Sequence, residues 1–244
     1  MTRDDSAWIR DWFAANARDW TPAPARDAAC VVFAPVSHDA EVARRCASVL
    51  SARELVQAER FLAEERRSRF KQQRAFRRYC GARALGSSLQ LSQIEFEESE
   101  KGRPYLSQAQ GISFSFSSCR FGFLGAWSST HDIGVDIEDR TRTTATGELA
   151  RRYFCEAEAK AVEAADSART FFQFWTLKEA ALKSIGEGLP FGLDAFQFEL
   201  TPTLRVVQAP GGPQRFYAHA IEGADTCAAV VTRQRATAAH RARG

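Results

Sequence analysis

The sequence lacks several features that would place it in a class at once. None of its six cysteines forms a C-x-x-C pair, which argues against a zinc site and against a disulfide framework in a chain of 244 residues. No apolar stretch approaches the length of a membrane span, and the opening MTRDDSAW has acidic side chains and no apolar run. We therefore expect a reduced, cytoplasmic protein that does not enter a membrane.

A strong overall charge is also missing. The net charge is +3, from 33 basic and 30 acidic residues, which is too small to predict nucleic acid as a partner. Basic residues cluster in residues 60–83 and 233–243, a pattern that favours a local anionic partner. No G-x-S-x-G motif is present, so serine hydrolase chemistry is not expected.

Residues 171–185, FFQFWTLKEAALKSI, predict a helix docked on a core. At about 100° per residue, its apolar side chains share one broad face, made of Phe171, Phe174, Trp175, Leu177, Ala181, Leu182 and Ile185. Lys178 projects into the middle of that face, and Glu179 lies at its edge. A lysine in this place either runs its methylenes along the apolar surface to water or meets an anion in a cleft, and the helix alone leaves both interpretations open.

Residues 133–138, IGVDIE, predict a strand with its apolar side chains on one face and two carboxylates on the other. Asp136 and Glu138 then lie roughly 7 Å apart and repel each other unless water, protonation or a hard cation intervenes. A solvated strand face is one interpretation. Together with Glu179 and the lysine beside it, the pair favours an oxygen-ligand Mg²⁺ site with a phosphate at its open positions.

The remaining segments predict alternating helices and strands. Ser51 and Glu54 have the spacing of a capping box. Arg74, Arg77 and Arg78 rim a long helix, either as a solvated face or as phosphate contacts. We expect helices over 39–50, 51–60, 71–89 and 146–164, strands over 30–35, 94–98 and 196–200, an antiparallel meander over 112–138, and three further strands around 206, 217 and 229.

A short internal echo favours two similar lobes. In each half a long helix leads through a loop into a strand, IEFEE after residues 71–89 and FQFEL after residues 169–186. Two like lobes would leave a cleft between them, which the acidic strand and the basic helix could both face.

Two motifs and their spacing resemble a known family. Residues 134–138, GVDIE, are followed by Phe154 and Glu158 and then by residues 175–183, WTLKEAALK. This arrangement is similar to the paired signature of the Sfp-type phosphopantetheinyl transferases, and residues 102–104, GRP, resemble the Gly-Lys-Pro turn of that family.

The resemblance implies an α+β fold of two pseudo-twofold-related lobes. Each lobe would be a small antiparallel sheet packed on a long helix, with the active site in the cleft between them. Residues 1–127 would form the N-terminal lobe on the coenzyme A side, residues 128–232 the C-terminal lobe with the metal site, and residues 233–244 a disordered basic tail.

The resemblance also implies an activity and its partners. The family transfers phosphopantetheine from coenzyme A to a serine of an acyl or peptidyl carrier protein, with Mg²⁺, and releases 3′,5′-ADP. We accordingly expect coenzyme A and a carrier protein as partners, neither nucleic acid nor a membrane, and a monomer.

Site residues are carried over by position. The metal ligands would be Asp136, Glu138 and Glu179, and Lys178 would face the diphosphate. The catalytic set would be Glu179, Lys178, Glu158 and Lys183, with Glu179, Glu158 or a metal-bound water as the base. The coenzyme A contacts would be Arg77, Arg103, Lys71, Ser117, Ser118, Lys178 and Lys183.

One departure separates this chain from the family pattern. The family usually has an Asn-Leu-Ser-His-Ser segment whose histidine helps to hold coenzyme A, and here Ser118 stands at the histidine position. Either coenzyme A binds more weakly, or Arg77 and Arg103 take a larger share of phosphate recognition. Two other classes stay open: another Mg²⁺-dependent phosphoryl or nucleotidyl transferase, and a catalytically silent module that binds carrier proteins or coenzyme A.

Overall fold

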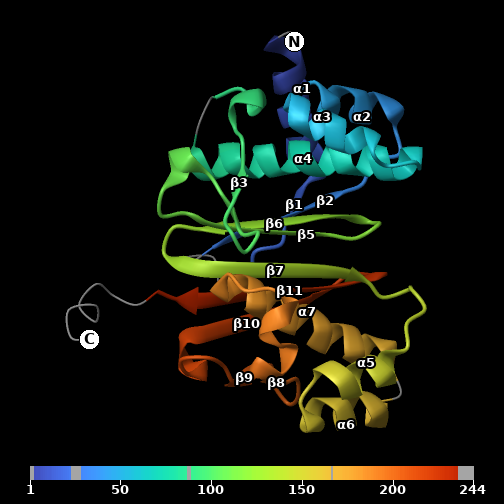
Figure 1. The fold of residues 1–244 in the computed structure, drawn as a ribbon, viewed down its shortest axis with the longest axis vertical. Helices are drawn as coiled ribbons and strands as arrows, with labels where there is room; N and C mark the ends of the chain where they lie inside the picture. The colour runs from blue at the N-terminus through green and yellow to red at the C-terminus, as the bar shows by residue number, and fades with distance from the viewer. Residues whose placement is uncertain (1–2, 23–28, 87–88, 166, 236–244) are drawn as a thin grey trace, which may run out of the picture.

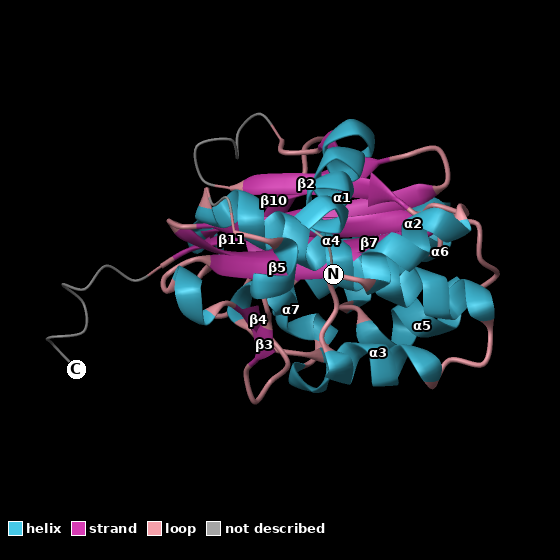
Figure 2. Ribbon diagram, turned by 90° about the horizontal axis from the view of Figure 1, so that it is seen from above, coloured by secondary structure: helices cyan, strands magenta, loops and turns pink. Residues whose placement is uncertain are grey.

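Two antiparallel sheets lie face to face at the centre of the molecule, and helices cover their outer faces (Figure 1). The computed structural model describes residues 3–22, 29–86, 89–165 and 167–235. The predicted mixture of helices and small antiparallel sheets is confirmed. Seen from above, strands of both sheets run across the molecule beneath the helices of the N-terminal half (Figure 2). The two-lobe arrangement with a pseudo-twofold axis stays a prediction.

The first sheet has the strand order β1-β2-β6-β5. The alternation of side chains along β6 divides its faces, because Phe123 and Trp127 pack toward the helices whereas Leu124 and Ala126 face the second sheet. Its strands are β1 (Arg18–Asp19), β2 (Cys30–Pro35), β5 (Ser113–Ser118) and β6 (Gly122–Ser128).

Four helices cover the outer face of this sheet. The predicted capping box of Ser51 and Glu54 is confirmed, since each side chain bonds the backbone of the other residue. The long helix begins at Glu64, earlier than predicted, because Ala63 at its N-cap offers no side-chain signal. It ends at Gly86, which has a φ of 59°. The helices are α1 (Arg3–Asn16), α2 (Ala40–Ala47), α3 (Ala52–Glu59) and α4 (Glu64–Leu85).

The second sheet has the order β10-β11-β7. This order corrects the predicted meander, because β7 follows β6 in sequence yet pairs with β11. An alternating pattern identifies strands but not their partners. Its strands are β7 (His131–Asp139), β10 (Phe216–Glu222) and β11 (Thr226–Gln234), and the helices of this half are α5 (Thr146–Tyr153), α6 (Glu156–Ala165) and α7 (Ala168–Ile185).

Short elements complete the chain. The predicted strand over 94–98 is reduced to two residues, because Ile94 is fully buried at the end of a 3₁₀ turn. The small strands are β3 (Glu97–Glu98), β4 (Pro104–Tyr105), β8 (Gln197–Glu199) and β9 (Arg205–Gln208), and the 3₁₀ turns are η2 (Leu91–Gln93), η3 (Ser107–Ala109), η4 (Leu189–Phe191), η5 (Leu193–Ala195) and η6 (Pro213–Arg215).

The interface between the sheets orients β7. Ile133, Val135 and Ile137 are buried in the cluster shared with the first sheet, as the alternation predicted. The intervening residues therefore face α7. At Gly134 the fit is so close that a Cβ atom would lie 1.9 Å from the carbonyl oxygen of Ala180 and 2.5 Å from the backbone nitrogen of Ser184. The absence of a side chain at Gly134 is what lets α7 lie directly on β7.

The last strand extends further than expected. Arg233 and Gln234 pair with Asp132 and His131 inside the second sheet, so the basic tail does not begin at residue 233. Residues 236–244 lie outside the described residues. In the part of the chain that the structure describes, no helix combines the length and the apolar composition needed to cross a membrane.

Replacing Gly134 by alanine should destabilise the fold strongly. The added methyl group meets the backbone of α7, so the helix must shift, and overpacking of this kind typically costs about 3 kcal/mol. Gly147→Ala is the control, because the nearest atom to its Cβ would be 3.8 Å away. Urea unfolding measures both free energies, and equal stabilities for the two variants would contradict the close packing of α7 on β7.

Candidate active site

Asp136 lies where β7, α7 and β5 meet, and only 5% of it is exposed. Its Oδ1 atom accepts hydrogen bonds from Lys183 Nζ and from Ser117 Oγ, each at 2.7 Å. Its Oδ2 atom is buried and has no hydrogen-bond partner among the residues that the structure describes. A buried carboxylate oxygen without a partner is costly, so this atom marks a place where a cation or a donor is expected.

Glu138 and Glu179 belong to the same electrostatic cluster. Burial and the nearby Asp136 carboxylate raise the pKa of Glu138 to about 7, and Glu179 adds to this rise. Burial and Asp136 likewise raise the pKa of Glu179. The guanidinium of Arg142 lies 3.4 Å from Glu138 and opposes the rise. Glu138 and Glu179 thus each feel the charge of the Asp136 carboxylate.

The residues present are compatible with a divalent metal ion, although they do not form a finished site. Among the residues described, no three His, Cys, Asp or Glu side chains form a group that could hold a metal ion. The oxygen donors are nevertheless those that Mg²⁺ prefers. Their mutual repulsion raises the pKa of Glu138, although Lys183 and Arg142 offset part of it. Among the described residues, Asp136 Oδ2 has no hydrogen-bond partner. The assignment of Asp136, Glu138 and Glu179 as metal ligands stays a prediction.

A cavity of about 230 Å³ opens beside this cluster. It is smaller than the ~300–1,000 Å³ typical of sites for drug-sized ligands, so it suits part of a larger molecule. Its basic and acidic side chains come from α4, the β3–β4 turn, α7 and the loop after α7. We call it the central cavity, and its lining residues are Arg77, Lys101, Gly102, Arg103, Pro104, Phe114, Ser115, Phe116, Glu179, Lys183, Gly186, Glu187 and Gly188.

Two arginines predicted to bind coenzyme A line the central cavity. The Arg77 guanidinium lies 5.2 Å from the Phe116 ring centroid and 3.7 Å from Glu98, and its Nε is buried without a hydrogen-bond partner. Arg103 donates to Ser113 Oγ at 2.6 Å. Burial lowers the pKa of Arg77 to about 10 and also lowers that of Arg103. Both remain cations at neutral pH, in surroundings where an anion is favoured.

An ion pair joins two walls of the central cavity. Lys101, from the turn before β4, contacts Glu187, from the loop that follows α7. Glu187 is half-buried and Lys101 is exposed, so the pair lies at the rim. It connects segments 86 residues apart in sequence.

Lys178 does not face the central cavity, and its predicted role at the diphosphate is wrong. Its side chain is fully buried, and Nζ lies 2.6 Å from Glu158 Oε2 and donates to the carbonyl oxygens of Leu193 and Phe196. Three acceptors satisfy its three protons. Burial lowers the pKa of Lys178, and the Glu158 carboxylate opposes that shift.

Glu158 is equally sequestered, which corrects its prediction as a catalytic residue. It is 1% exposed, and besides Lys178 it accepts hydrogen bonds from the backbone nitrogens of Cys155 and Phe198. This carboxylate ties the start of α6 to β8, while its lysine partner ties α7 to η5. The pair is a structural clamp under α7 and has no path to a substrate hydroxyl.

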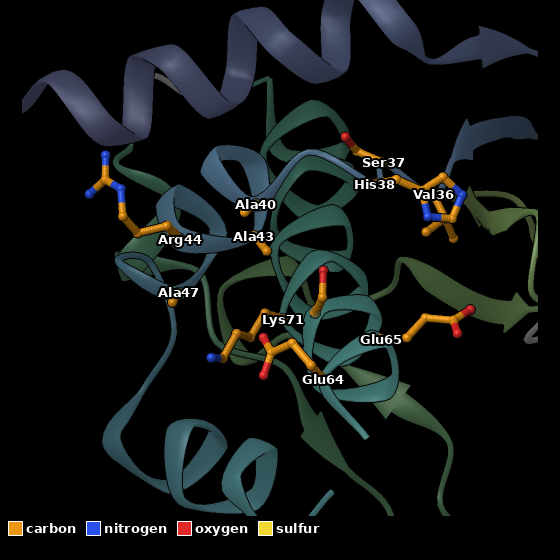
Figure 3. Close-up of a pocket in the computed structure, with 11 residues that line it drawn as sticks. Val36, Ser37, His38, Ala40, Ala43, Arg44, Ala47, Glu64, Glu65 and Lys71 are labelled. Atoms are coloured by element: carbon orange, nitrogen blue, oxygen red, sulfur yellow. The ribbon is translucent and has the colours of Figure 1, made fainter. Parts of the chain in front are cut away.

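Three further predicted coenzyme A contacts lie elsewhere. Lys71 lines a separate cavity of about 440 Å³ between α2 and α4 (Figure 3). Its Nζ is 3.6 Å from Glu59. Ser118 accepts a hydrogen bond from Gln73, and Ser117 donates to Asp136. None of the three lines the central cavity as the structure describes it. Spacing on α4 separates Lys71 from Arg77, because six residues turn the helix by about 240°.

The sequence did not predict the side chains that contact the acidic residues of this site. Arg142 lies four residues after Glu138, a spacing visible in the sequence, but its pairing depends on the turn after β7. The contact of Ser117 with Asp136 joins residues 19 positions apart and has no local signal. The alternating serines of SFSFSS are the local signal that could have identified one polar face on β5.

The fold and the site define a mixed α/β protein in which an acidic cluster borders a basic cavity, an arrangement suited to a phosphorylated ligand. The sequence model of the 4′-phosphopantetheinyl transferase superfamily matches residues 132–231. This segment contains α7, all but the first residue of β7 and the first part of β11.

Relatives with known names extend the match. The chain is 32% identical over 163 residues to the 4′-phosphopantetheinyl transferase HetI of Nostoc sp., covering 64% of this chain and 68% of the relative. It is 31% identical over 182 residues to a phosphopantetheinyl transferase of Thraustochytrium sp., covering 67% and 61%. It is 31% identical over 115 residues to the 4′-phosphopantetheinyl transferase Sfp of Bacillus subtilis, covering 46% and 50%. The chain belongs to the 4′-phosphopantetheinyl transferase family, which confirms the family and the enzyme class predicted from the motifs.

Breaking the buried ion pair of Lys178 and Glu158 should lower the free energy of unfolding without changing the central cavity. Lys178→Met leaves the Glu158 carboxylate buried without its cation, and loss of one partner of such a pair typically costs about 3 kcal/mol or more. Lys160→Met, which removes an exposed lysine paired with Glu156, is the control and should not change the unfolding midpoint in urea. A Lys178→Met protein as stable as the parent would refute the clamp.

The raised pKa of Glu138 should appear as a pH-dependent stability in the metal-free protein. Between its ordinary value of 4.5 and about 7, the folded state holds a proton that the unfolded chain has released. The free energy of unfolding therefore falls as the pH rises through this window. Glu138→Gln should reduce that fall, whereas Glu65→Gln at an exposed position should not. Urea unfolding with a chelator gives the free energy of unfolding at pH 5 and at pH 7.5 for the parent and both variants. The same change in free energy between the two pH values in all three proteins would contradict the raised pKa.

Proposed function

We propose that this protein transfers the phosphopantetheine group of coenzyme A to a serine of an acyl or peptidyl carrier protein, with Mg²⁺, and releases 3′,5′-ADP. Family membership supports the transferase class. The observation that carries the finer assignment is that Lys183 belongs to both halves of the site: its ammonium contacts Asp136 and its side chain lines the central cavity beside Arg103.

The basic side chains would bind the charged part of coenzyme A. Arg77, Arg103 and Lys183 line one cavity from three different elements, so a diphosphate placed there would meet positive charge from several directions. The Nε of Arg77 is a free donor within this wall. Because Ser118 is held by Gln73, we assign phosphate recognition mainly to the arginines.

The acidic side chains would hold the metal ion. Asp136, Glu138 and Glu179 would be its protein ligands, and Asp136 Oδ2 is the oxygen without another partner. When bound, the ion would neutralise the diphosphate and make its phosphorus a better target for a hydroxyl. Lys183 would remain near the leaving phosphate and offset the charge that builds there.

Burial limits which protein side chain can accept the serine proton. Glu158 is enclosed by the clamp and cannot reach a hydroxyl, which leaves Glu179 as the protein carboxylate of the two considered. Burial and Asp136 raise the pKa of Glu179 in the metal-free protein. Its side chain lines the central cavity, where the carrier serine would have to arrive.

Incubation with coenzyme A, Mg²⁺ and an apo-carrier protein should increase the carrier mass by one phosphopantetheine group. Asp136→Ala should reduce the rate to background, because the variant loses the central carboxylate of the acidic cluster. Glu65→Ala, at an exposed position on α4 far from the cluster in sequence, should retain the parent rate. Mass spectrometry across acyl and peptidyl carriers is the measurement.

Other outcomes would separate the competing functions. Carrier masses that stay unchanged across the whole panel would refute the proposed transfer. Turnover of a nucleotide with no change in carrier mass would identify another Mg²⁺-dependent transferase. Binding of coenzyme A or carrier without turnover would identify a silent module.

A further inference from the structure

Three serines alternate along β5 and face β7. Both strands are at the edges of their sheets, so β7 presents backbone groups on that side that β11 does not pair. Ser113 Oγ accepts a hydrogen bond from the backbone nitrogen of Ile133, and Ser115 Oγ accepts one from that of Val135, each at 3.0 Å. Serine hydroxyls thus replace backbone pairing along this seam between the two sheets.

Ser117 has the same alternation but a different contact. Its hydroxyl donates to Asp136 Oδ1 at 2.7 Å and does not contact the backbone of β7 among the bonds described. Lys183 Nζ donates to the same oxygen at the same distance. Both donors therefore lie on Oδ1, and Oδ2 is left buried and without a partner.

We propose that Ser117 is a positioning residue that fixes the rotation of the Asp136 carboxylate so that Oδ2 faces the metal ion. The inference rests on the proposed function, because it presumes that Asp136 is a metal ligand. Hydrogen bonds to a ligating carboxylate orient it, and their loss typically lowers metal affinity about 10- to 100-fold.

The two donors on Oδ1 are not equivalent. Lys183 is half-buried, sits on a flexible four-carbon stem and lines the central cavity, so an anionic substrate attracts its ammonium away from Asp136. Ser117 has a short side chain on a strand that pairs with β6 through its whole length. Its hydroxyl keeps its place when the cavity fills, and this makes it the more constant restraint on the carboxylate.

The competing interpretation is that Ser117 only joins the sheets, as Ser113 and Ser115 do. The two interpretations differ in what an alanine substitution changes. A seam residue contributes to stability alone, whereas a positioning residue also sets the affinity for the metal ion. Ser6→Ala is the matched control, because it removes one buried serine hydroxyl that accepts a backbone hydrogen bond, from Leu91, and does not line the central cavity.

The experiment measures the dissociation constant of Mn²⁺, as a paramagnetic substitute for Mg²⁺, by electron paramagnetic resonance with and without coenzyme A. Ser117→Ala should weaken Mn²⁺ binding about tenfold or more. Ser117→Thr, which keeps the hydroxyl, should restore affinity to within a few fold of the parent, and Ser6→Ala should leave it unchanged. Urea unfolding of all variants shows that each is folded at the temperature used.

The outcomes separate this inference from the proposed function. Unchanged Mn²⁺ affinity in a folded Ser117→Ala protein overturns the positioning role while the metal-dependent function stands. Equal losses in Ser117→Ala and Ser6→Ala also overturn it, because they indicate a general effect of losing a buried hydroxyl. A parent protein that binds no Mn²⁺ under either condition overturns the metal-dependent function and the positioning role together.

Discussion

The site depends on the direct contact of α7 with β7 at Gly134. A side chain there would collide with the backbone at Ala180, and any larger separation would move Glu179 and Lys183 away from the strand that carries Asp136. The acidic cluster is therefore a consequence of helix packing. Lys183 and Arg142 offset part of the repulsion among its carboxylates, and the rest is retained because the packing that buries the carboxylates also fixes their spacing.

Two lysines five residues apart on α7 have opposite roles. Lys178 is enclosed with Glu158 and holds the helix to η5 and β8, whereas Lys183 reaches the boundary between the acidic cluster and the central cavity. The buried pair fixes the rotation of α7, and this rotation aims Glu179 and Lys183 at β7. A charged clamp inside the fold thus supports a charged site at its surface without contacting a substrate.

The sequence was sufficient for the features that depend on local patterns. The capping box at Ser51, the strand carrying Asp136 and the amphipathic helix carrying Glu179 follow from spacing and periodicity. The pairing of the strands could not be predicted in this way, because an alternating pattern does not indicate which sheet edge a strand joins. Nor could the burial of Lys178, since a lysine on an apolar face is compatible with a cleft or with a buried carboxylate, and only the tertiary fold supplies Glu158.

The central claim is that Asp136, Glu138 and Glu179 hold one divalent ion beside the basic cavity. Anomalous diffraction from crystals grown with Mn²⁺ and coenzyme A tests it most directly. The account predicts a manganese peak within coordination distance of Asp136 Oδ2, with the diphosphate between Arg103 and Lys183. A fully occupied manganese peak remote from Asp136, or coenzyme A bound with its diphosphate outside the central cavity, would contradict it.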